Sequence, residues 1–347
     1  MKRKRVTLDD IADRAYVSKS LVSKVLNNRP VRVSEEKRLE ILNLANMMDY
    51  IPSGKILQND SIPKLNKTIA LFLPHLNTNF MMTLCDTITR KAYRNGYSVI
   101  VFNSIENTSL ELKYIDLCYT LNVSGIIFDS YSNASNKKYL EKLEQNQIPF
   151  VFIDCYPTDT SYSFITSENK KAMKELTESL IRRGHKNILS FIQNKSTLTN
   201  VSMQRIAGYY EAMSQYNLRG TNEIIYPERD YRQQPIYSLL ESSAEFSAFI
   251  IHTGDDIKHF FDLISYTKYA HRQNFEVAVF DDFDLSFTEY SSGTHKDICQ
   301  KIVSIMAQRP KEIAERALDV LFGQIKQPDN FQHIQEFVDC DLIEINN

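Results

Sequence analysis

The chain has 347 residues, of which 43% are hydrophobic and 24% charged, and its formal net charge is −2. This length exceeds one ordinary domain, and the composition is that of a folded globular protein rather than a disordered or fibrous one. Its five cysteines are scattered and form no CxxC pair. That spacing argues against a disulfide framework or a zinc cage and favours a reducing compartment.

Charge is distributed unevenly along the chain. Residues 1–33 carry nine Lys and Arg against three Asp, a balance of +6, which leaves −8 for the remainder. A basic head on an acidic body predicts a polyanionic partner for the head, although a solvated basic tail would show the same charge. The basic start, Lys2 to Arg5, runs into a polar stretch instead of an apolar one. We therefore expect neither export nor a membrane association, and a cytoplasmic location.

Residues 1–50 are predicted to form a small all-α domain with three helices. Thr7 is placed to cap the first helix, with Asp10 completing a capping box, and Ser18 and Ser34 are placed to cap the others. Each helix has apolar residues at helical spacing, which predicts one buried face. The expected faces are Leu8, Ile11, Ala12 and Ala15; Leu21, Val22, Val25 and Leu26; and Leu39, Ile41, Leu42, Leu44, Ala45 and Met48.

The second helix, residues 18–26, is the candidate DNA-reading element. Two helices joined by a tight turn, the second rich in short polar and basic residues, form the arrangement that places a helix in the major groove. The apolar residues would hold this helix on the other two, and a solvated three-helix bundle would share that pattern. The side chains then left for base edges and phosphates are Lys19, Ser20, Ser23, Lys24, Asn27, Asn28 and Arg29.

Several stretches of the first 52 residues match one known pattern, nearly without gaps. They are Val6–Ala12, Val17–Asn27, Val33–Glu36 and Asp49–Pro52. In these stretches the chain closely resembles the head of the lactose-repressor (LacI/GalR) family. The resemblance implies a dimeric, sequence-specific transcription regulator, expected to be a repressor, that binds operator DNA. The DNA-binding residues that it implies are Thr7, Ser18, Lys19, Ser20, Leu21, Ser23, Lys24, Asn27, Arg29, Tyr50 and Leu57.

The head departs from the family pattern at three places. Tyr16 stands where glycine is usual, so it must adopt an uncommon backbone conformation or shift the turn. Lys24 stands where arginine is usual and lacks its bidentate fork. The linker, residues 51–67, contains Gly54 and Pro63 and lacks the Arg-x-Leu pattern, which predicts that the usual minor-groove hinge helix does not form. The alternative is that Leu57 inserts between base pairs from a shifted helix.

From residue 68 to 347, short apolar strands alternate with helices. This alternation predicts parallel sheets covered by helices on both faces, and roughly 280 residues exceed one compact sheet, so we expect a two-lobed α/β body. The predicted strands are Ile69–Leu73, Ser98–Phe102, Gly125–Phe128, Phe150–Ile153, Asn187–Ile192, Ala248–Ile251 and Val277–Phe280. The predicted helices are Met81–Asn95, Leu110–Leu121, Lys137–Gln145, Lys170–Arg183, Gln204–Tyr216 and Asp256–Tyr269.

Almost every predicted strand of the body ends on polar residues. Ligands of open α/β sheets bind beyond the carboxyl ends of the strands, where carboxylates, amides and an aromatic ring suit a polyhydroxylated ligand. A single Asp after a strand is, however, more often a turn former or a helix cap. The strand-end residues that we regard as candidate ligand contacts are Asn79, Phe80, Asp129 and Asp154.

The body also resembles that of the lactose-repressor family, which has a periplasmic-binding-protein-like fold. The matching segments are Pro149–Asp154, Arg183–Ile188, Arg205–Tyr209, Gly254–Asp255, Val277–Asp284 and Gln308–Ile313. The resemblance implies an effector-binding and dimerisation domain that binds a sugar or sugar derivative between its lobes. It adds Arg205 and Asp255 as effector contacts, with either Asp282 or Asp284, and places the late segment near Gln308 at a crossing between the lobes.

Sequence signals of catalysis are missing. The chain contains no serine nucleophile elbow, P-loop or GxGxxG motif, and only nine glycines. We expect His185 to make a structural hydrogen bond rather than to act as a base. We therefore predict no enzymatic activity, no cofactor and no metal. The alternatives are a secreted sugar-binding protein, which the basic head opposes, and an enzyme with an appended DNA-binding module.

Overall fold

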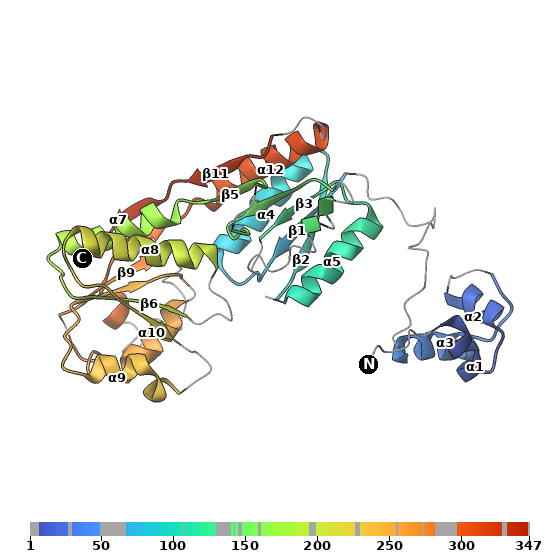
Figure 1. Ribbon diagram of the computed structural model, residues 1–347, viewed down its shortest axis with the longest axis horizontal. Helices are drawn as coiled ribbons and strands as arrows, with labels where there is room; N and C mark the ends of the chain where they lie inside the picture. The colour runs from blue at the N-terminus through green and yellow to red at the C-terminus, as the bar shows by residue number, and fades with distance from the viewer. Residues whose placement is uncertain are drawn as a thin grey trace. The chain divides into compact units, whose positions relative to one another are not determined.

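The computed structural model describes most of the chain in two compact units, Met1–Pro63 and Lys64–Asn347 (Figure 1). The described residues are 7–26, 30–48, 67–105, 107–129, 140–141, 143–144, 148–158, 161–193, 199–225, 230–254, 256–272, 274–281, 297–327 and 332–345. The boundary between the units falls inside the predicted linker. Apart from Lys67, that linker lies outside the described residues. The prediction about its hinge helix therefore falls on residues that the structure does not describe.

The head contains the three predicted helices, α1 (Leu8–Ala15), α2 (Lys19–Leu26) and α3 (Glu35–Met47). Their caps are confirmed. The Thr7 side chain and Asp10 form a capping box, and the hydroxyls of Ser18 and Ser34 accept from the third residue of the helix that follows, both at 3.2 Å. The buried core of the head comprises Ile11, Ala12, Ala15, Val22, Val25, Ile41 and Ala45.

The predicted apolar face of α3 was wrong for two residues. Leu39 is 57% exposed and Leu42 is 40% exposed, whereas Ile41 and Ala45 are buried. Because an α-helix turns about 100° per residue, Ile41 and Ala45 point to one side and Leu39 and Leu42 point away from it. A helix that packs on two short neighbours buries one narrow stripe, so hydrophobic character alone overestimated its buried face.

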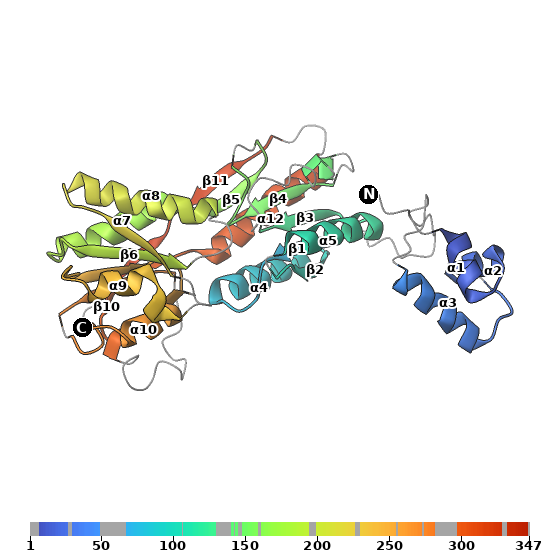
Figure 2. The ribbon, with the colours of Figure 1, turned by 60° about the horizontal axis from the view of Figure 1, so that its bottom comes forward.

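The first lobe of the body is a six-stranded, parallel sheet with the order β11-β5-β4-β3-β1-β2. Its strands are β1 (Thr68–Leu73), β2 (Ser98–Asn103), β3 (Gly125–Phe128), β4 (Phe150–Ile153), β5 (Phe164–Ser167) and β11 (Gln335–Val338). The helices α4 (Asn79–Arg94) and α12 (Pro310–Lys326) pack on one face, and α5 (Thr108–Leu121) packs on the other (Figure 2).

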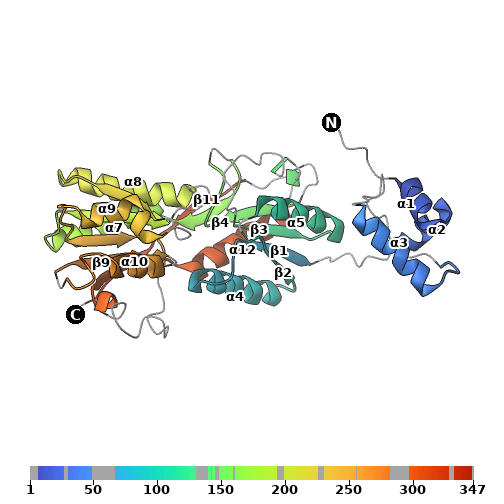
Figure 3. The same cartoon turned by 90° about the horizontal axis from the view of Figure 1, so that it is seen from below.

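The second lobe repeats this plan with the order β12-β10-β9-β8-β6-β7, in which only β12 is antiparallel to its neighbour. Its strands are β6 (Ile188–Gln193), β7 (Thr221–Ile225), β8 (Ala248–Ile251), β9 (Glu276–Phe280), β10 (Ile302–Ala307) and β12 (Asp341–Glu344). The helices α7 (Asn169–Arg182) and α8 (Asn200–Gln215) cover one face, and α9 (Pro235–Glu241) and α10 (Asp256–Ser265) cover the other (Figure 3). A short 3-10 helix, Tyr231–Gln233, precedes α9.

The close contact of α7 with α8 requires Gly208. A Cβ atom at this position would lie 2.2 Å from the carbonyl oxygen of Lys170, which is backbone and cannot move aside cheaply. The glycine thus lets the middle of α8 approach the start of α7, and α8 is the helix that brings polar residues to the boundary between the lobes.

The chain passes between the lobes at three places, after β5, after β10 and after β11. The segment of Gln308 is one of them, as the resemblance implied. All seven predicted strands occur, each to within one residue at its ends, whereas β5, β7, β10, β11, β12, α9 and α12 were not predicted. The predicted helix Lys137–Gln145 lies mostly outside the described residues. Among the described residues, no helix is both long and apolar enough to cross a membrane.

Candidate functional sites

The reading face of the head is formed by α2. Lys19, Ser20 and Lys24 are exposed, while Val22 and Val25 are buried against α1 and α3. The helix α2 therefore has two faces. One is apolar and packs on α1 and α3, and the other exposes hydroxyl and ammonium groups to solvent. The predicted contacts Leu21 and Ser23 are half-buried between them.

Some of the predicted DNA-binding side chains already have roles within the head. Thr7 and Ser18 cap α1 and α2. The Lys19 ammonium lies 2.7 Å from a carboxylate oxygen of Asp9, and both side chains are more than half exposed. An exposed ion pair of this kind contributes little stability, so the ammonium can exchange Asp9 for another anion. Asn27, Arg29, Tyr50 and Leu57 lie outside the described residues.

Tyr16, which stands where the family usually has glycine, adopts the left-handed backbone conformation. Its φ is 53° and its ψ is 44°, and its backbone N–H donates to the carbonyls of Ala12 and Asp13 at the end of α1. The side chain is 90% exposed. The turn between α1 and α2 is therefore kept in place, at the energetic cost of a left-handed residue other than glycine.

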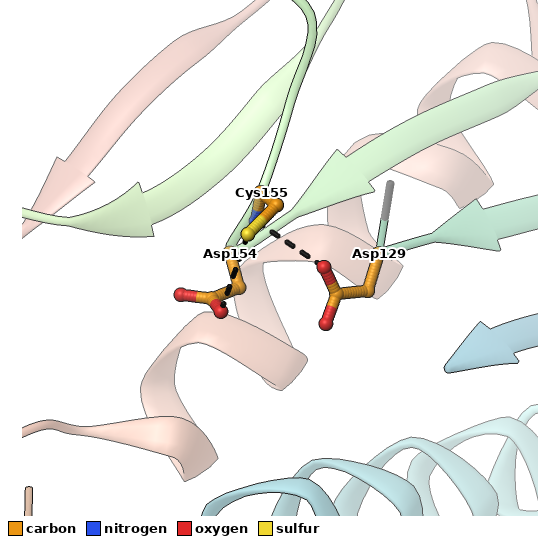
Figure 4. A group of neighbouring side chains, drawn as sticks. All are labelled: Asp129, Asp154 and Cys155. Carbon is orange, nitrogen blue, oxygen red and sulfur yellow. Dashed lines mark hydrogen bonds between the residues drawn. The ribbon is translucent and has the colours of Figure 1, made fainter. Parts of the chain in front are cut away.

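At the carboxyl edge of the first sheet, the ends of β3 and β4 bring Asp129, Asp154 and Cys155 together (Figure 4). One donor atom from each side chain lies within 4.8 Å of the others. The Cys155 backbone N–H donates to Asp129 at 3.4 Å, and the Cys155 thiol lies 3.9 Å from Asp154 Oδ2. Two carboxylates at such a separation repel each other by about 3 kcal/mol at an effective dielectric constant of about 20.

Asp154 holds a conformation that its neighbours impose. Its φ is 53°, its N–H donates to the Ile165 carbonyl at 3.1 Å, and its own carbonyl accepts from the Thr166 hydroxyl at 2.8 Å. Left-handed backbone away from glycine costs free energy and persists where surrounding contacts fix it. Here these contacts fix the carboxylate at the end of β4.

At the carboxyl edge of the second sheet, the same position is held by Asp281, at the end of β9, with a φ of 86°. The Arg205 guanidinium lies 3.6 Å from Asp281 Oδ2, and the Gln308 amide donates to Asp281 Oδ1. Arg205 also donates to Asn169 Oδ1 at 2.8 Å and to the His252 carbonyl at 2.5 Å. Its guanidinium carbon lies 3.7 Å from the centre of the Phe280 ring, and the residue is 2% exposed.

His252 lies beside Arg205 and is fully buried. Its Nε2 is 2.6 Å from the Ser190 hydroxyl, which also donates to Asn222 at 3.0 Å. Burial and, secondarily, the positive charge of Arg205 lower the pKa of His252 to about 3. The ring is therefore neutral at physiological pH and serves as a hydrogen-bonding group rather than as a second cation.

Tyr156 connects the two edges. It follows Cys155 in the first lobe, and its ring stacks on Phe164 with 3.8 Å between ring centres. Two residues of α8, in the second lobe, bond to it: Asn200 Oδ1 accepts from the Tyr156 N–H at 3.3 Å, and the Gln204 amide donates to the Tyr156 hydroxyl at 3.0 Å. The strand ends of lobe 1 and the start of α8 therefore form one polar boundary.

Further polar atoms at this boundary are buried without a hydrogen-bond partner among the described residues. They are Asn200 Nδ2, His252 Nδ1 and Thr253 Oγ1. Buried polar groups are normally hydrogen-bonded, and leaving one unpaired costs about 1–3 kcal/mol. Three such atoms around one boundary are typical of a place where a polar ligand or water completes the bonding.

The sequence predictions for the effector site have mixed outcomes. Asp129, Asp154 and Arg205 lie at the facing edges of the two lobes, whereas Asp255, Asp282 and Asp284 lie outside the described residues. Asn79 is exposed and Phe80 is half-buried, both in the first turn of α4 at the end of β1. Five residues at this boundary were not predicted from the sequence: Asp281, Asn169, Tyr156, Asn200 and His252. The signal for Asp281 was present, because it directly follows its strand as Asp154 does.

Residues at the amino ends of the strands of the second sheet have structural roles. His185 contacts the Ser247 hydroxyl at 3.0 Å and the Glu276 carboxylate at 2.8 Å, which confirms that this histidine makes structural hydrogen bonds. A cavity of about 370 Å³, lined by Glu245, Phe246, Ser247, Arg272 and Asn274, lies at this edge. Because its residues precede β8 and β9, the cavity is at the far end of the strands from Arg205.

Both the head and the body of the chain match known protein families. Residues 7–53 match the family model described as bacterial regulatory proteins of the lacI family. Residues 66–252, more than half of the chain, match the model described as periplasmic binding proteins and sugar-binding domain of the LacI family.

Named relatives cover different shares of the chain. The NTD biosynthesis operon regulator NtdR of Bacillus subtilis (strain 168) is 31% identical over 229 residues, which are 64% of this chain and 65% of NtdR, so the match spans less than two thirds of that relative. A Lac repressor structure bound to ONPG has a TM-score of 0.63 at 18% identity, covering 98% of this chain and 99% of that chain. The Cra regulator of Pseudomonas putida in complex with fructose 1-phosphate has a TM-score of 0.66 at 18% identity, covering 81% and 99%. At such identities the two structures show a shared fold.

Proposed function

Because the chain belongs to the LacI family of bacterial regulatory proteins, we propose that it is a transcription regulator that binds operator DNA through its head and a small sugar-like effector between its lobes. It acts as a homodimer in the cytoplasm, represses transcription, and catalyses no reaction. The observation that carries this proposal is the division of α2 into a buried apolar face and an exposed face with Lys19, Ser20 and Lys24.

The head supplies the groups that DNA recognition needs. Lysine ammonium groups donate to guanine O6 and N7 or to phosphates, and serine hydroxyls bond to either. A single helix contacts too few base pairs for specificity, which favours two heads on a near-palindromic site. The expected contacts outside the described residues are Asn27, Arg29, Tyr50 and Leu57.

The body supplies a boundary suited to a hydroxylated ligand. Carboxylates at the ends of β3 and β4 accept from hydroxyls, and the buried Asn200 Nδ2 donates to a hydroxyl or ring oxygen. NtdR, Lac repressor and Cra support this reading by family likeness, and two of the compared structures hold small molecules, ONPG and fructose 1-phosphate. Binding of a ligand across the two lobes would change their closure, and closure would change the spacing of two heads in a dimer.

The DNA-binding proposal is tested by selecting preferred sequences from a random DNA library with the full chain. We expect a near-palindromic site. Lys24→Ala should weaken binding to that site by about 1–3 kcal/mol and relax its sequence preference if Lys24 reads a base. Arg94→Ala, which removes one exposed positive charge at the end of α4 in the body, is the matched control. Selection that returns no preferred sequence would contradict the proposal, and an equal loss across all sequences would assign Lys24 to phosphate contact.

A further inference from the structure

Tyr16, in the turn between α1 and α2, holds an uncommon backbone conformation and adds nothing to the core of the head. Its φ is 53°, and its side chain is 90% exposed, more than any other large hydrophobic side chain among the described residues. Within the part of the chain that the structure describes, this side chain makes no hydrogen bond and no aromatic contact. Glycine at the same place would avoid the cost of left-handed backbone. A strained residue that the fold does not need is typical of a functional position.

The position of Tyr16 brings its side chain to the start of the reading helix. Tyr16 precedes Lys19, the first residue of α2, by three residues, and three residues of chain span at most about 11 Å. It also follows Asp9 by seven residues, or about two helical turns, so the two lie on the same side of α1. The Lys19 ammonium contacts Asp9 on that side, at 2.7 Å. Tyr16 and the exposed Lys19 therefore share one side of the head.

The surroundings of Tyr16 favour a polyanion over an apolar partner. Its neighbours Asp13, Arg14 and Ser18 are exposed and polar, and residues 1–33 together carry a charge of +6. An apolar protein surface would remove water from these polar groups without replacing its hydrogen bonds. Phosphate oxygens accept from hydroxyl and ammonium groups alike. A phenol supplies one O–H donor on a rigid ring with two rotatable bonds, so ordering it on DNA costs little entropy.

We propose that Tyr16 is a further DNA contact, whose hydroxyl donates to a backbone phosphate beside the base pairs that α2 reads. This inference rests on the proposed function, because it concerns the same DNA-binding head. Phosphate contacts position a helix on DNA and add affinity, but they carry no sequence information. Glycine at residue 16 would keep the turn and lose the contact. The tyrosine therefore adds affinity for DNA while it lowers the stability of the head.

The test uses the full chain and the operator that the DNA selection returns. Tyr16→Phe removes only the hydroxyl, whereas Tyr16→Gly removes the whole side chain and relieves the backbone. We expect Tyr16→Phe to bind the operator about tenfold more weakly, because a hydrogen bond to a charged group is lost, and Tyr16→Gly to bind at least as weakly. Both losses should be equal across operators with altered bases. Tyr216→Gly, which removes an exposed tyrosine from the end of α8 where φ is −96°, should leave binding unchanged.

The contacted phosphate can be located on the DNA. Operator phosphates are replaced one at a time by methylphosphonates, which lack the negative charge, and wild type is compared with Tyr16→Phe at each position. A hydrogen bond from the hydroxyl to one phosphate predicts one position in each half-site where wild type loses more affinity than Tyr16→Phe does.

Hydrogen exchange of the full chain, followed by mass spectrometry, reports on the fold of the head. Because glycine relieves the left-handed backbone, the amides of α1 and α2 should exchange no faster in Tyr16→Gly than in wild type. In Tyr16→Phe they should exchange at the wild-type rate, since the exposed hydroxyl makes no contact within the described residues.

The outcomes separate this inference from the proposed function. If Tyr16→Phe binds a selected operator as tightly as wild type, the inference is overturned and the DNA-binding regulator stands. Losses that depend on base sequence, or equal losses of both proteins at every methylphosphonate, would overturn it as well. Faster exchange of α1 and α2 in both variants would assign the losses to the fold of the head, with the same consequence. A selection that returns no preferred sequence would overturn the inference and the proposed function together.

Discussion

The two lobes place an aspartate at the same point of the same fold and surround it differently. Asp154 follows β4 and Asp281 follows β9, each the third strand in its sheet, and both residues have a positive φ. Asp281 has the Arg205 guanidinium and the Gln308 amide beside it, so its charge is balanced within the protein. Asp154 has the Asp129 carboxylate and the Cys155 thiol beside it, so a second carboxylate lies near it where Asp281 has a guanidinium.

The difference teaches that equivalent positions in similar lobes can have separate roles. In lobe 2 the aspartate joins a buried network that includes Asn169 from α7 and Gln308 from the crossing after β10, and Gln308 also accepts from the Ser167 hydroxyl at 2.5 Å. That network holds the crossings between the lobes. In lobe 1 the described neighbour of Asp154 is a second carboxylate, Asp129, and the two carboxylates repel each other.

The largest expected effect comes from breaking the network of lobe 2. Arg205→Ala leaves Asp281, the Asn169 amide oxygen and the His252 carbonyl without their shared donor, and the unfolding free energy should fall by about 3–5 kcal/mol. Urea unfolding of the full chain measures it. The control Arg94→Ala, which removes an exposed arginine, should stay within about 0.5 kcal/mol of wild type. An Arg205→Ala protein of unchanged stability would show that the network does not hold the lobe.

The next effect uses pH to probe the same network. Because the pKa of His252 is lowered to about 3, the unfolded chain binds a proton below pH 6.5 that the folded chain does not bind. His252 therefore imposes no penalty above pH 6.5, and stability is lost as the pH falls from there toward 3, by about 1.4 kcal/mol per pH unit.

Unfolding at pH 7.5, 6.5 and 5.5 should show this slope, and His252→Gln should reduce it by the part that His252 contributes. If wild type and His252→Gln lose stability in parallel, another group is responsible and the account of this histidine is wrong.

The smallest expected effect concerns the link between the edges. Tyr156→Phe removes the hydroxyl that accepts from Gln204 and keeps the ring on Phe164. One neutral hydrogen bond contributes about 0.5–1.5 kcal/mol, so stability should fall within that range. Gln204→Ala should give a similar loss, and the double variant should lose no more than either one alone. Additive losses would mean that the two side chains do not act on each other.

The buried strands were predicted well from the sequence because continuous apolar runs are distinctive. The strands β1, β3, β4 and β8 are buried along their whole length, and each was found within one residue. The edge strands β11 and β12 are mostly exposed and polar, so no apolar run marks them. The helix α12 was missed although it buries Ile313, Ala317 and Leu321 at helical spacing.

The candidate site was predicted only in part, for a physical reason. Asp129, Asp154 and Arg205 were recognised because they follow strands or match a family motif. Asn169, His252 and Gln308 act through buried hydrogen bonds between segments far apart in the chain, and no local pattern encodes such pairings. Only Asp282 and Asp284 were considered as ligand contacts in the segment Phe280–Asp284, and Asp281 was not. The reason is that this segment can be aligned with the family's Asp-Asp turn in more than one way.

The most direct test of the difference between the lobes is the thermal midpoint of Asp129→Asn and Asp281→Asn, measured side by side without ligand. Removing one of two repelling carboxylates should raise the midpoint by about 2–4 °C for each kcal/mol of repulsion relieved. Removing the partner of Arg205 should lower the midpoint by a similar or larger amount, since a buried charge loses its counter-charge. Opposite signs are the predicted result. If both variants melt below wild type, repulsion between Asp129 and Asp154 does not govern the stability of lobe 1, and the account of a difference between the lobes is contradicted.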